Sequence, residues 1–207
     1  RKRFEPSRFG FDNNIAGNDK GSPKSYFSPF QNPNLADGPK GEELTERCTT
    51  EEIKFMAADK GRPFFLHLSY HAVHIPLQAR KELIAKYQAK ADGLPKEDAF
   101  APLAETKVRL RHDNAVYAAL VETLGRNVGR LLDAPDKLGI AEDTIIVFTS
   151  DNGGVATSEG WPTSNLPLRA GKGWLYEGGI RVPWLIRWPG KTQPGQKVAT
   201  PVISTDF

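Results

Sequence analysis

Three short clusters of polar residues carry side chains that could take part in a reaction. The first is Asp151-Asn152, which stands between the apolar residues 145–148 and the pair Gly153-Gly154. A carboxylate and an amide carbonyl are hard oxygen donors that suit Ca²⁺ or Mg²⁺, and glycines let the backbone fold tightly around an ion. Because Asn-Gly is also a strong turn former, the cluster taken alone is read more readily as a simple turn.

The second cluster holds His71 and His74, in the loop that follows the apolar residues 64–70. Two imidazoles at this spacing, in a loop stiffened by Pro76, could bind a metal ion or transfer protons. No further nitrogen or sulfur ligand stands nearby in the sequence, so a zinc site would need ligands from elsewhere. A single histidine in a loop is more often structural, and neither residue is assigned a role by itself.

The third cluster is Gly171-Lys172-Gly173. Between two glycines, the Lys172 ammonium could approach an oxyanion with little steric obstruction. The Gly-x-x-x-x-Gly-Lys-Ser/Thr spacing of a phosphate-binding P-loop is absent. A lysine in a surface turn is the simpler interpretation of this cluster alone.

Elements must position these clusters, and the hydrophobic pattern predicts helices that alternate with strands. Helices are predicted over residues 50–59, 80–89 and 106–132, and strands over 64–70, 145–148 and 182–188. The strands are apolar throughout, which is typical of strands buried on both faces. The sequence therefore predicts an α/β layer protein with a mainly parallel central sheet flanked by helices, and with functional groups beyond the carboxyl ends of the strands.

Residues 10–42 are rich in Gly, Pro, Asn and Ser, a composition that makes turns and extended loops. Aromatic residues are nevertheless spread through this segment: Phe11, Tyr26, Phe27 and Phe30. Disordered tracts are usually poor in aromatic residues. We therefore expect an ordered loop that lies over the body of the protein, near a site.

Composition excludes several classes of protein. The net charge of +3 is already supplied by residues 1–8, so the remainder is balanced, which argues against a nucleic-acid surface. No run of about 18 apolar residues exists, and no membrane span is predicted. Cys48 is the only cysteine, so no internal disulfide can form, and we interpret it as structural.

Taken together and in this order, the clusters resemble the sulfatase family within the alkaline-phosphatase superfamily. The matching stretches are PFFLHLSYHAVHIP, VYAALVETLGRNVGRLL, DTIIVFTSDNGG and PLRAGKGWLYEGGIRVPWLIRWPG. GFDNNIAG and SYFSPFQNPNL also resemble the substrate-loop region of polysaccharide-sulfatase-like members. The resemblance implies an alkaline-phosphatase-like layered fold, present in part: residues 1–207 belong to one catalytic domain, with 10–42 as the substrate-loop region and 62–207 as the core strands and helices.

The resemblance also implies roles for four residues. Asp151 and Asn152 would be ligands of one Ca²⁺, Lys172 would bind the sulfate, and His74 would contact the sulfate ester and protonate its leaving oxygen. Such groups stabilise the negative charge that develops as the ester is cleaved. The implied activity is a sulfuric ester hydrolase that acts on a sulfated carbohydrate or an aryl sulfate, in a periplasmic or secreted protein.

The chain departs from the family's pattern at the nucleophile. The family uses a formylglycine made from a Cys or Ser in a Cys/Ser-x-Pro-x-Arg motif, whereas Cys48 is followed by Thr-Thr-Glu. Position 1 is not Met, and the sequence stops directly after the strand-like residues 201–204. We therefore expect a fragment truncated at both ends, which lacks the N-terminal part with the formylglycine and is inactive alone.

Two other functions stay open at the level of sequence. One is a phosphoester or phosphonate hydrolase of the same superfamily, although two-metal phosphatases tend to place Asp-His where this chain has Asp151-Asn152, and an amide suits one hard cation better than Zn²⁺. The other is a non-catalytic glycan-binding relative that has lost its nucleophile. The sugar, the position of its sulfate and the oligomeric state are not predicted.

Overall fold

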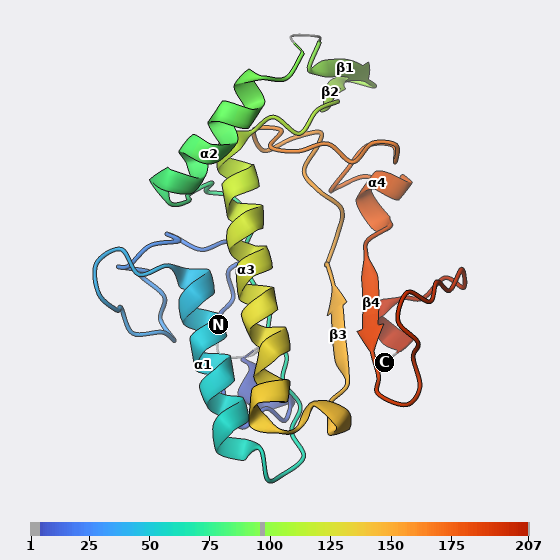
Figure 1. Ribbon diagram of the computed structural model, residues 1–207. Helices are drawn as coiled ribbons and strands as arrows, with labels where there is room; N and C mark the ends of the chain where they lie inside the picture. The colour runs from blue at the N-terminus through green and yellow to red at the C-terminus, as the bar shows by residue number, and fades with distance from the viewer. Residues whose placement is uncertain (1–4, 96–97, 207) are drawn as a thin grey trace.

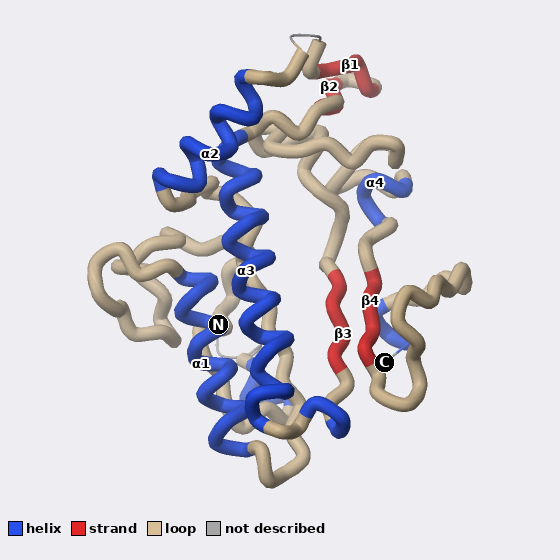
Figure 2. The backbone as a smooth tube through the Cα atoms, in the orientation of Figure 1, coloured by secondary structure: helices blue, strands red, loops and turns tan. Residues whose placement is uncertain are grey.

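The computed structural model describes residues 5–95 and 98–206. Its helices are α1 (Leu44–Asp59), α2 (Lys81–Asp92), α3 (Ala115–Leu138) and the short α4 (Glu177–Ile180). The strands are β1 (Phe100–Leu103), β2 (Thr106–Arg109), β3 (Ile146–Thr149) and β4 (Trp184–Arg187). Within the described ranges, three single turns of 3-10 helix lie at Pro6–Phe9, Ala141–Asp143 and Ser204–Asp206. Figures 1 and 2 show the three longer helices on one side, the β3–β4 ribbon on the other and long loops between them.

The helices form one packed layer in which α3 contacts both α1 and α2. The core between them is made by residues from both the helices and the N-terminal loop: Tyr26, Phe30, Leu35, Leu44 and Leu120. Tyr26 and Leu120 are fully buried. The expectation of an ordered loop over residues 10–42 is therefore confirmed, since its aromatic side chains supply much of this core.

Helix α1 begins earlier than predicted. The predicted start was residue 50, but the helix extends from Leu44, and Glu43 stands at the N-cap position. Inside the helix, the Thr49 and Thr50 hydroxyls donate hydrogen bonds of 2.8 Å to the carbonyls of Thr45 and Glu46. Threonine side chains can bond either a free N–H at a cap or a carbonyl one turn back, so their position alone did not fix the boundary.

The predicted helix over residues 106–132 is divided differently in the structure. Strands β1 and β2 form an antiparallel hairpin, so residues 106–109 are not helical. Helix α3 starts after Asn114, whose side chain accepts a hydrogen bond from the Tyr117 N–H, and it continues to Gly139 in the left-handed conformation. The predicted end at residue 132 is therefore wrong, since the helix continues to Leu138.

The predicted strands differ from the structure in pairing and in burial. Both described sheets have two strands and are antiparallel, so the expected parallel pairing is not seen among the described strands. Residues 64–70 form no strand in the described part of the chain. The apolar strands are also not buried on both faces: Phe65 is 75% exposed and Leu185 is 61% exposed. β3 and β4 pair antiparallel because the chain between them turns back, whereas parallel strands need a crossover.

Two predictions about single features can be compared with the structure. Cys48 packs against the core, and burial raises the pKa of its thiol to about 12, so the thiol stays protonated as a structural residue would. In the described residues, no helix combines the length and apolar character that crossing a bilayer requires.

Candidate active site

The structure brings two of the four predicted site residues into direct contact. The Nζ of Lys172 lies 2.9 Å from the Nε2 of His74, although the two residues are 98 positions apart in the sequence. Both side chains are partly accessible, 30% for His74 and 27% for Lys172. The Lys172 ammonium and the His74 imidazole are therefore adjacent and partly accessible to solvent, so both can contact the same ligand.

The contacts of His74 fix its tautomer in this arrangement. Its Nδ1 lies 3.0 Å from the Ile75 carbonyl, which can only accept a hydrogen bond, so Nδ1 carries the proton. Its Nε2 faces the Lys172 ammonium, which can only donate. The Tyr26 hydroxyl also donates to the His74 carbonyl at 3.0 Å, so the buried core holds this backbone in place. Nε2 is thus the nitrogen of His74 that faces a ligand.

Close backbone packing positions Lys172 beside the loop that follows β3. The Lys172 N–H donates to the Gly154 carbonyl at 3.1 Å, and the Gly153 N–H donates to the Gly179 carbonyl at 2.9 Å. A Cβ on Gly171 would collide with the carbonyl of Gly154. Gly153 of the first cluster and Gly171 of the third are therefore required, because a Cβ at either would meet the backbone of the facing segment.

Asp151 and Asn152 lie in contact with each other at the end of β3, where the Asn152 amide donates to the Asp151 carboxylate. The hydrogen bond between Gly154 and Lys172 joins their loop to the lysine loop, but neither side chain is in contact with His74 or Lys172 in the described structure. Their oxygens are of the hard type that Ca²⁺ prefers, and they supply two of the six to eight ligands that Ca²⁺ takes. Among the described residues, no group of three or more His, Cys, Asp or Glu could hold a metal ion.

Glu159 belongs to this site, and the sequence analysis missed it. Its carboxylate oxygens lie 3.3 and 3.5 Å from the Lys172 Nζ, and one of them lies 3.9 Å from the His74 Nε2. Glu159, Gly160 and Trp161 all have positive φ, of 51°, 84° and 48°. Non-glycine residues in this conformation often mark functional sites, because the surrounding structure must enforce the strain.

The hairpin β1–β2 holds the Glu159 loop in this conformation. The Arg109 N–H donates to the Ala156 carbonyl at 2.9 Å, and the Arg109 guanidinium donates to the Trp161 carbonyl at 2.9 Å. The Trp161 indole donates to the Lys107 carbonyl at 3.0 Å. The dipeptide Glu159-Gly160 carries no signal for a site in the sequence, since only this hairpin brings it to Lys172.

His71, which received no role from the sequence, forms a turn with His74. The His74 N–H donates to the His71 carbonyl at 2.7 Å. Burial, together with the nearby His74, lowers the pKa of the His71 imidazole below its ordinary value. His71 is therefore neutral at pH 7, and it faces a separate cavity rather than Lys172.

Comparison with known proteins identifies relatives of the chain. It is 40% identical to a sulfatase of Formosa agariphila over 154 residues, and this match covers 70% of this chain and 24% of that protein. It is 34% identical to the steryl-sulfatase of Homo sapiens over 79% of this chain and 25% of that protein. The N-acetylgalactosamine-6-sulfatase of Mus musculus is 30% identical over 95% of this chain and 36% of that protein. The chain thus spans about a quarter to a third of the length of these relatives.

Solved structures show the same fold. The structure of Ps i-CgsB in complex with k-i-k-neocarrahexaose matches with a TM-score of 0.57 and 35% identity, over 75% of this chain and 30% of that one. The PsFucS1 sulfatase from Pseudoalteromonas sp. matches with a TM-score of 0.50 and 29% identity, over 71% of this chain and 25% of that one. The α/β fold is thus the one found in sulfatases, present here in part. The sulfatase family model matches residues 1–207, and the chain belongs to the sulfatase family.

Proposed function

We propose that the protein to which this chain belongs hydrolyses sulfate esters, with His74 and Lys172 binding the ester group. The contact of 2.9 Å between Lys172 and His74 carries this proposal. It places an ammonium and an imidazole nitrogen at one accessible position, which suits a tetrahedral anion with several acceptor oxygens. Membership of the sulfatase family makes a sulfate ester the expected anion.

In the proposed reaction, each side chain meets charge that grows as the ester bond breaks. As the nucleophile bonds to sulfur and the ester S–O bond breaks, the Lys172 ammonium donates to a non-bridging sulfate oxygen. A His74 imidazolium, which has taken its second proton from solvent, gives the Nε2 proton to the leaving oxygen, which departs as a hydroxyl group. The Ile75 carbonyl keeps Nδ1 turned away, so that Nε2 points to the ester. Groups fixed in this way stabilise the transition state more than the ground state.

Asp151 and Asn152 are proposed to provide two ligands of a Ca²⁺ ion. Bound there, the ion would neutralise charge on the sulfate group. The nucleophile is proposed to be a formylglycine elsewhere in the protein, because the Cys/Ser-x-Pro-x-Arg motif does not occur in these 207 residues. An exported location, periplasmic or secreted, would give the protein access to calcium and to sulfated glycans.

We further propose a sulfated carbohydrate as the substrate. Relatives are named as sulfatases of both a steryl and an N-acetylgalactosamine substrate, and one similar structure holds k-i-k-neocarrahexaose. Glu159 supports the carbohydrate, since a carboxylate beside the ester group can accept hydrogen bonds from neighbouring hydroxyls, which a sterol ring lacks.

The assignment is tested with Lys172→Ala in the full-length protein. Removing a charge-stabilising donor typically lowers kcat by about 10² to 10³. We therefore expect that loss in assays with a nitrophenyl sulfate and with sulfated oligosaccharides. Lys191→Ala, which removes an exposed lysine of the loop after β4, serves as the matched control and should retain wild-type turnover. Undiminished turnover by Lys172→Ala would contradict the role of Lys172, and turnover of nitrophenyl phosphate in preference to the sulfate would contradict the reaction.

A further inference from the structure

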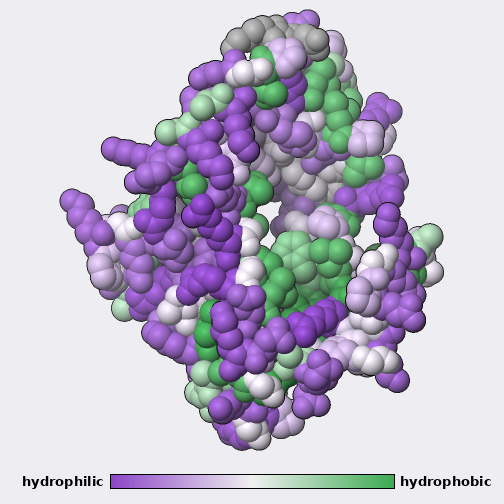
Figure 3. Space-filling view, in the orientation of Figure 1, coloured by the Kyte–Doolittle hydropathy of each residue, from purple (hydrophilic) through white to green (hydrophobic). Residues whose placement is uncertain are grey.

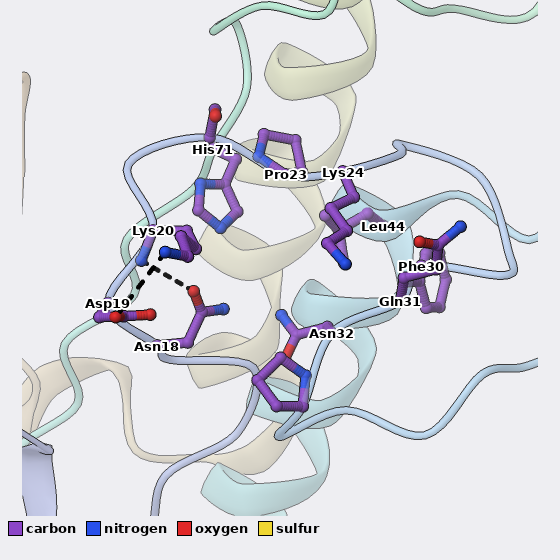
Figure 4. A pocket seen from close by; sticks show the side chains of 12 residues that line it. Asn18, Asp19, Lys20, Pro23, Lys24, Phe30, Gln31, Asn32, Leu44 and His71 are labelled. Atoms are coloured by element: carbon purple, nitrogen blue, oxygen red, sulfur yellow. Dashed lines mark hydrogen bonds and ion pairs between the residues drawn. The ribbon is translucent and has the colours of Figure 1, made fainter. Parts of the chain in front are cut away.

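A cavity of about 560 Å³ is lined by residues of the N-terminal loop, by Leu44 and by His71. Its lining includes Lys20, Lys24, Asn32 and His71, with Phe30 and Leu44 as its apolar part. Figure 4 shows the His71 ring, the Lys24 chain and the Asn32 amide directed toward one another across the cavity, with Lys20 near the imidazole. The cavity has the size of a small-ligand pocket.

The cavity and the candidate active site share one wall, the turn from His71 to His74. His71 lines the cavity, and its carbonyl accepts the hydrogen bond from the N–H of His74, whose Nε2 meets Lys172 on the other side. The loop that forms the rest of the cavity is fixed to the same segment by Tyr26, which donates its hydroxyl to the His74 carbonyl and its N–H to Gln78. A ligand that extends from the ester group past this turn would enter the cavity.

The charges of the cavity favour an anion. Lys20 and Lys24 bring two ammonium groups, whereas Asp19 is the one acidic residue of the lining, and it lies 3.8 Å from Lys20 at the surface. His71 is neutral at pH 7 and can donate or accept a hydrogen bond. The exposed Pro33 offers an apolar surface to one face of a sugar ring. Two ammonium groups beside amide side chains and an imidazole suit an acidic sugar.

We propose that this cavity binds an anionic sugar adjacent to the one whose sulfate ester is cleaved, with Lys20 and Lys24 holding its sulfate or carboxylate. The inference rests on the proposed function and narrows its substrate to a glycan that carries charge on neighbouring sugars. Such a subsite adds binding energy away from the reacting bond, which a small aryl sulfate cannot use.

The test compares substrates in the full-length protein and in the variant Lys20→Gln/Lys24→Gln. The substrates are a disaccharide sulfated on both sugars, the same disaccharide with one sulfate, and a nitrophenyl sulfate. We expect the double variant to raise KM for the disulfated sugar by about ten-fold and to leave nitrophenyl sulfate turnover within about two-fold. A disaccharide with a carboxylate in place of the second sulfate tells which anion the lysines prefer.

A variant with the same loss of charge, Lys60→Gln/Lys191→Gln, serves as the control, because both lysines are exposed and line no part of this cavity. An unchanged KM for the disulfated sugar, or an equal loss on the aryl sulfate, would overturn the subsite. Calorimetric binding of the disulfated sugar separates the two proposals. Lysine-dependent binding without any sulfatase turnover would sustain the subsite and overturn the proposed function, whereas aryl sulfate turnover without lysine-dependent binding would do the reverse.

Discussion

At the scale of single residues, the candidate site is a group of three charged or ionisable side chains. Lys172 and His74 would repel each other if both were protonated, and the Glu159 carboxylate within 4 Å of both offsets that repulsion. An incoming sulfate must compete with this carboxylate for the ammonium. In the proposed site, Glu159 would therefore position the Lys172 ammonium and would at the same time weaken the binding of free sulfate.

Glu159→Gln separates these effects, since it removes the charge and keeps the shape. We expect kcat of the full-length protein to fall by about ten-fold, because Lys172 is less well held, an effect of about 1.4 kcal/mol. Product sulfate should inhibit the variant at lower concentrations than the wild type. The measurements are steady-state kinetics and the inhibition constant of sulfate, with Glu105→Gln in the β1–β2 hairpin as the control. A parallel weakening of sulfate inhibition and kcat would show that Glu159 has only a structural role.

At the scale of elements, the sequence named two side chains that the structure brings together, but it did not predict the elements that hold them. His74 and Lys172 were named because their loops resemble motifs of the sulfatase family, since neither cluster was assigned a role by itself. Glu159 could not, because it is positioned by the β1–β2 hairpin, whose residues 106–109 fitted a helical pattern equally well. Helix α2 and most of α3 were predicted because hydrophobic spacing is a local signal, whereas strand pairing depends on distant segments.

The close packing of Gly178 against the backbone of the Lys172 loop leads to a prediction at the scale of elements. A Cβ on Gly178 would collide with the carbonyls of Arg169 and Ala170, so Gly178→Ala must move the loop that carries Lys172. Misplacement by about 1 Å can cost about 10² in rate, and we expect a loss of that order in kcat/KM.

Gly125→Ala serves as the control for this substitution. Gly125 lies in α3 with open space around it, and replacing it should stabilise the helix by about 0.5–1 kcal/mol without changing turnover. Wild-type kinetics for Gly178→Ala would show that the close packing of the loops is not required.

At the scale of the whole molecule, several apolar residues of β3 and β4 are exposed rather than buried. Figure 3 shows apolar surface on the face between α3 and the β3–β4 ribbon, and Val147, Phe148, Leu185 and Ile186 are among the exposed apolar residues of these strands. The apolar sequence of a strand indicates that the strand favours a buried position. Whether its side chains are buried depends on the elements that pack against the strand. The described helices cover these strands only in part, which is why the prediction of strands buried on both faces was wrong.

The buried carboxyl of Glu43 makes the stability of the whole molecule depend on pH. Glu43 is 2% exposed at the start of α1, and neither of its carboxylate oxygens has a hydrogen-bond partner in the described structure. Burial raises its pKa from 4.5 to about 6; the nearby Glu46 carboxylate adds to this rise, and the Arg80 guanidinium opposes it only in part. A raised folded-state pKa means that its contribution to stability is complete below pH 4.5 and is lost as the pH rises through 6.

Glu43→Gln tests this dependence, because an amide does not ionise. The difference in the free energy of unfolding between variant and wild type should shift in favour of the variant by about 2 kcal/mol from acid to neutral pH, since one pKa unit corresponds to about 1.4 kcal/mol. Denaturant unfolding of the full-length protein at several pH values measures that difference. Glu82→Gln, at an exposed position of α2, gives the contribution of a solvated carboxylate for comparison. A difference for Glu43→Gln that stays constant across this range would mean that the Glu43 carboxyl ionises as easily in the folded protein as in the unfolded chain.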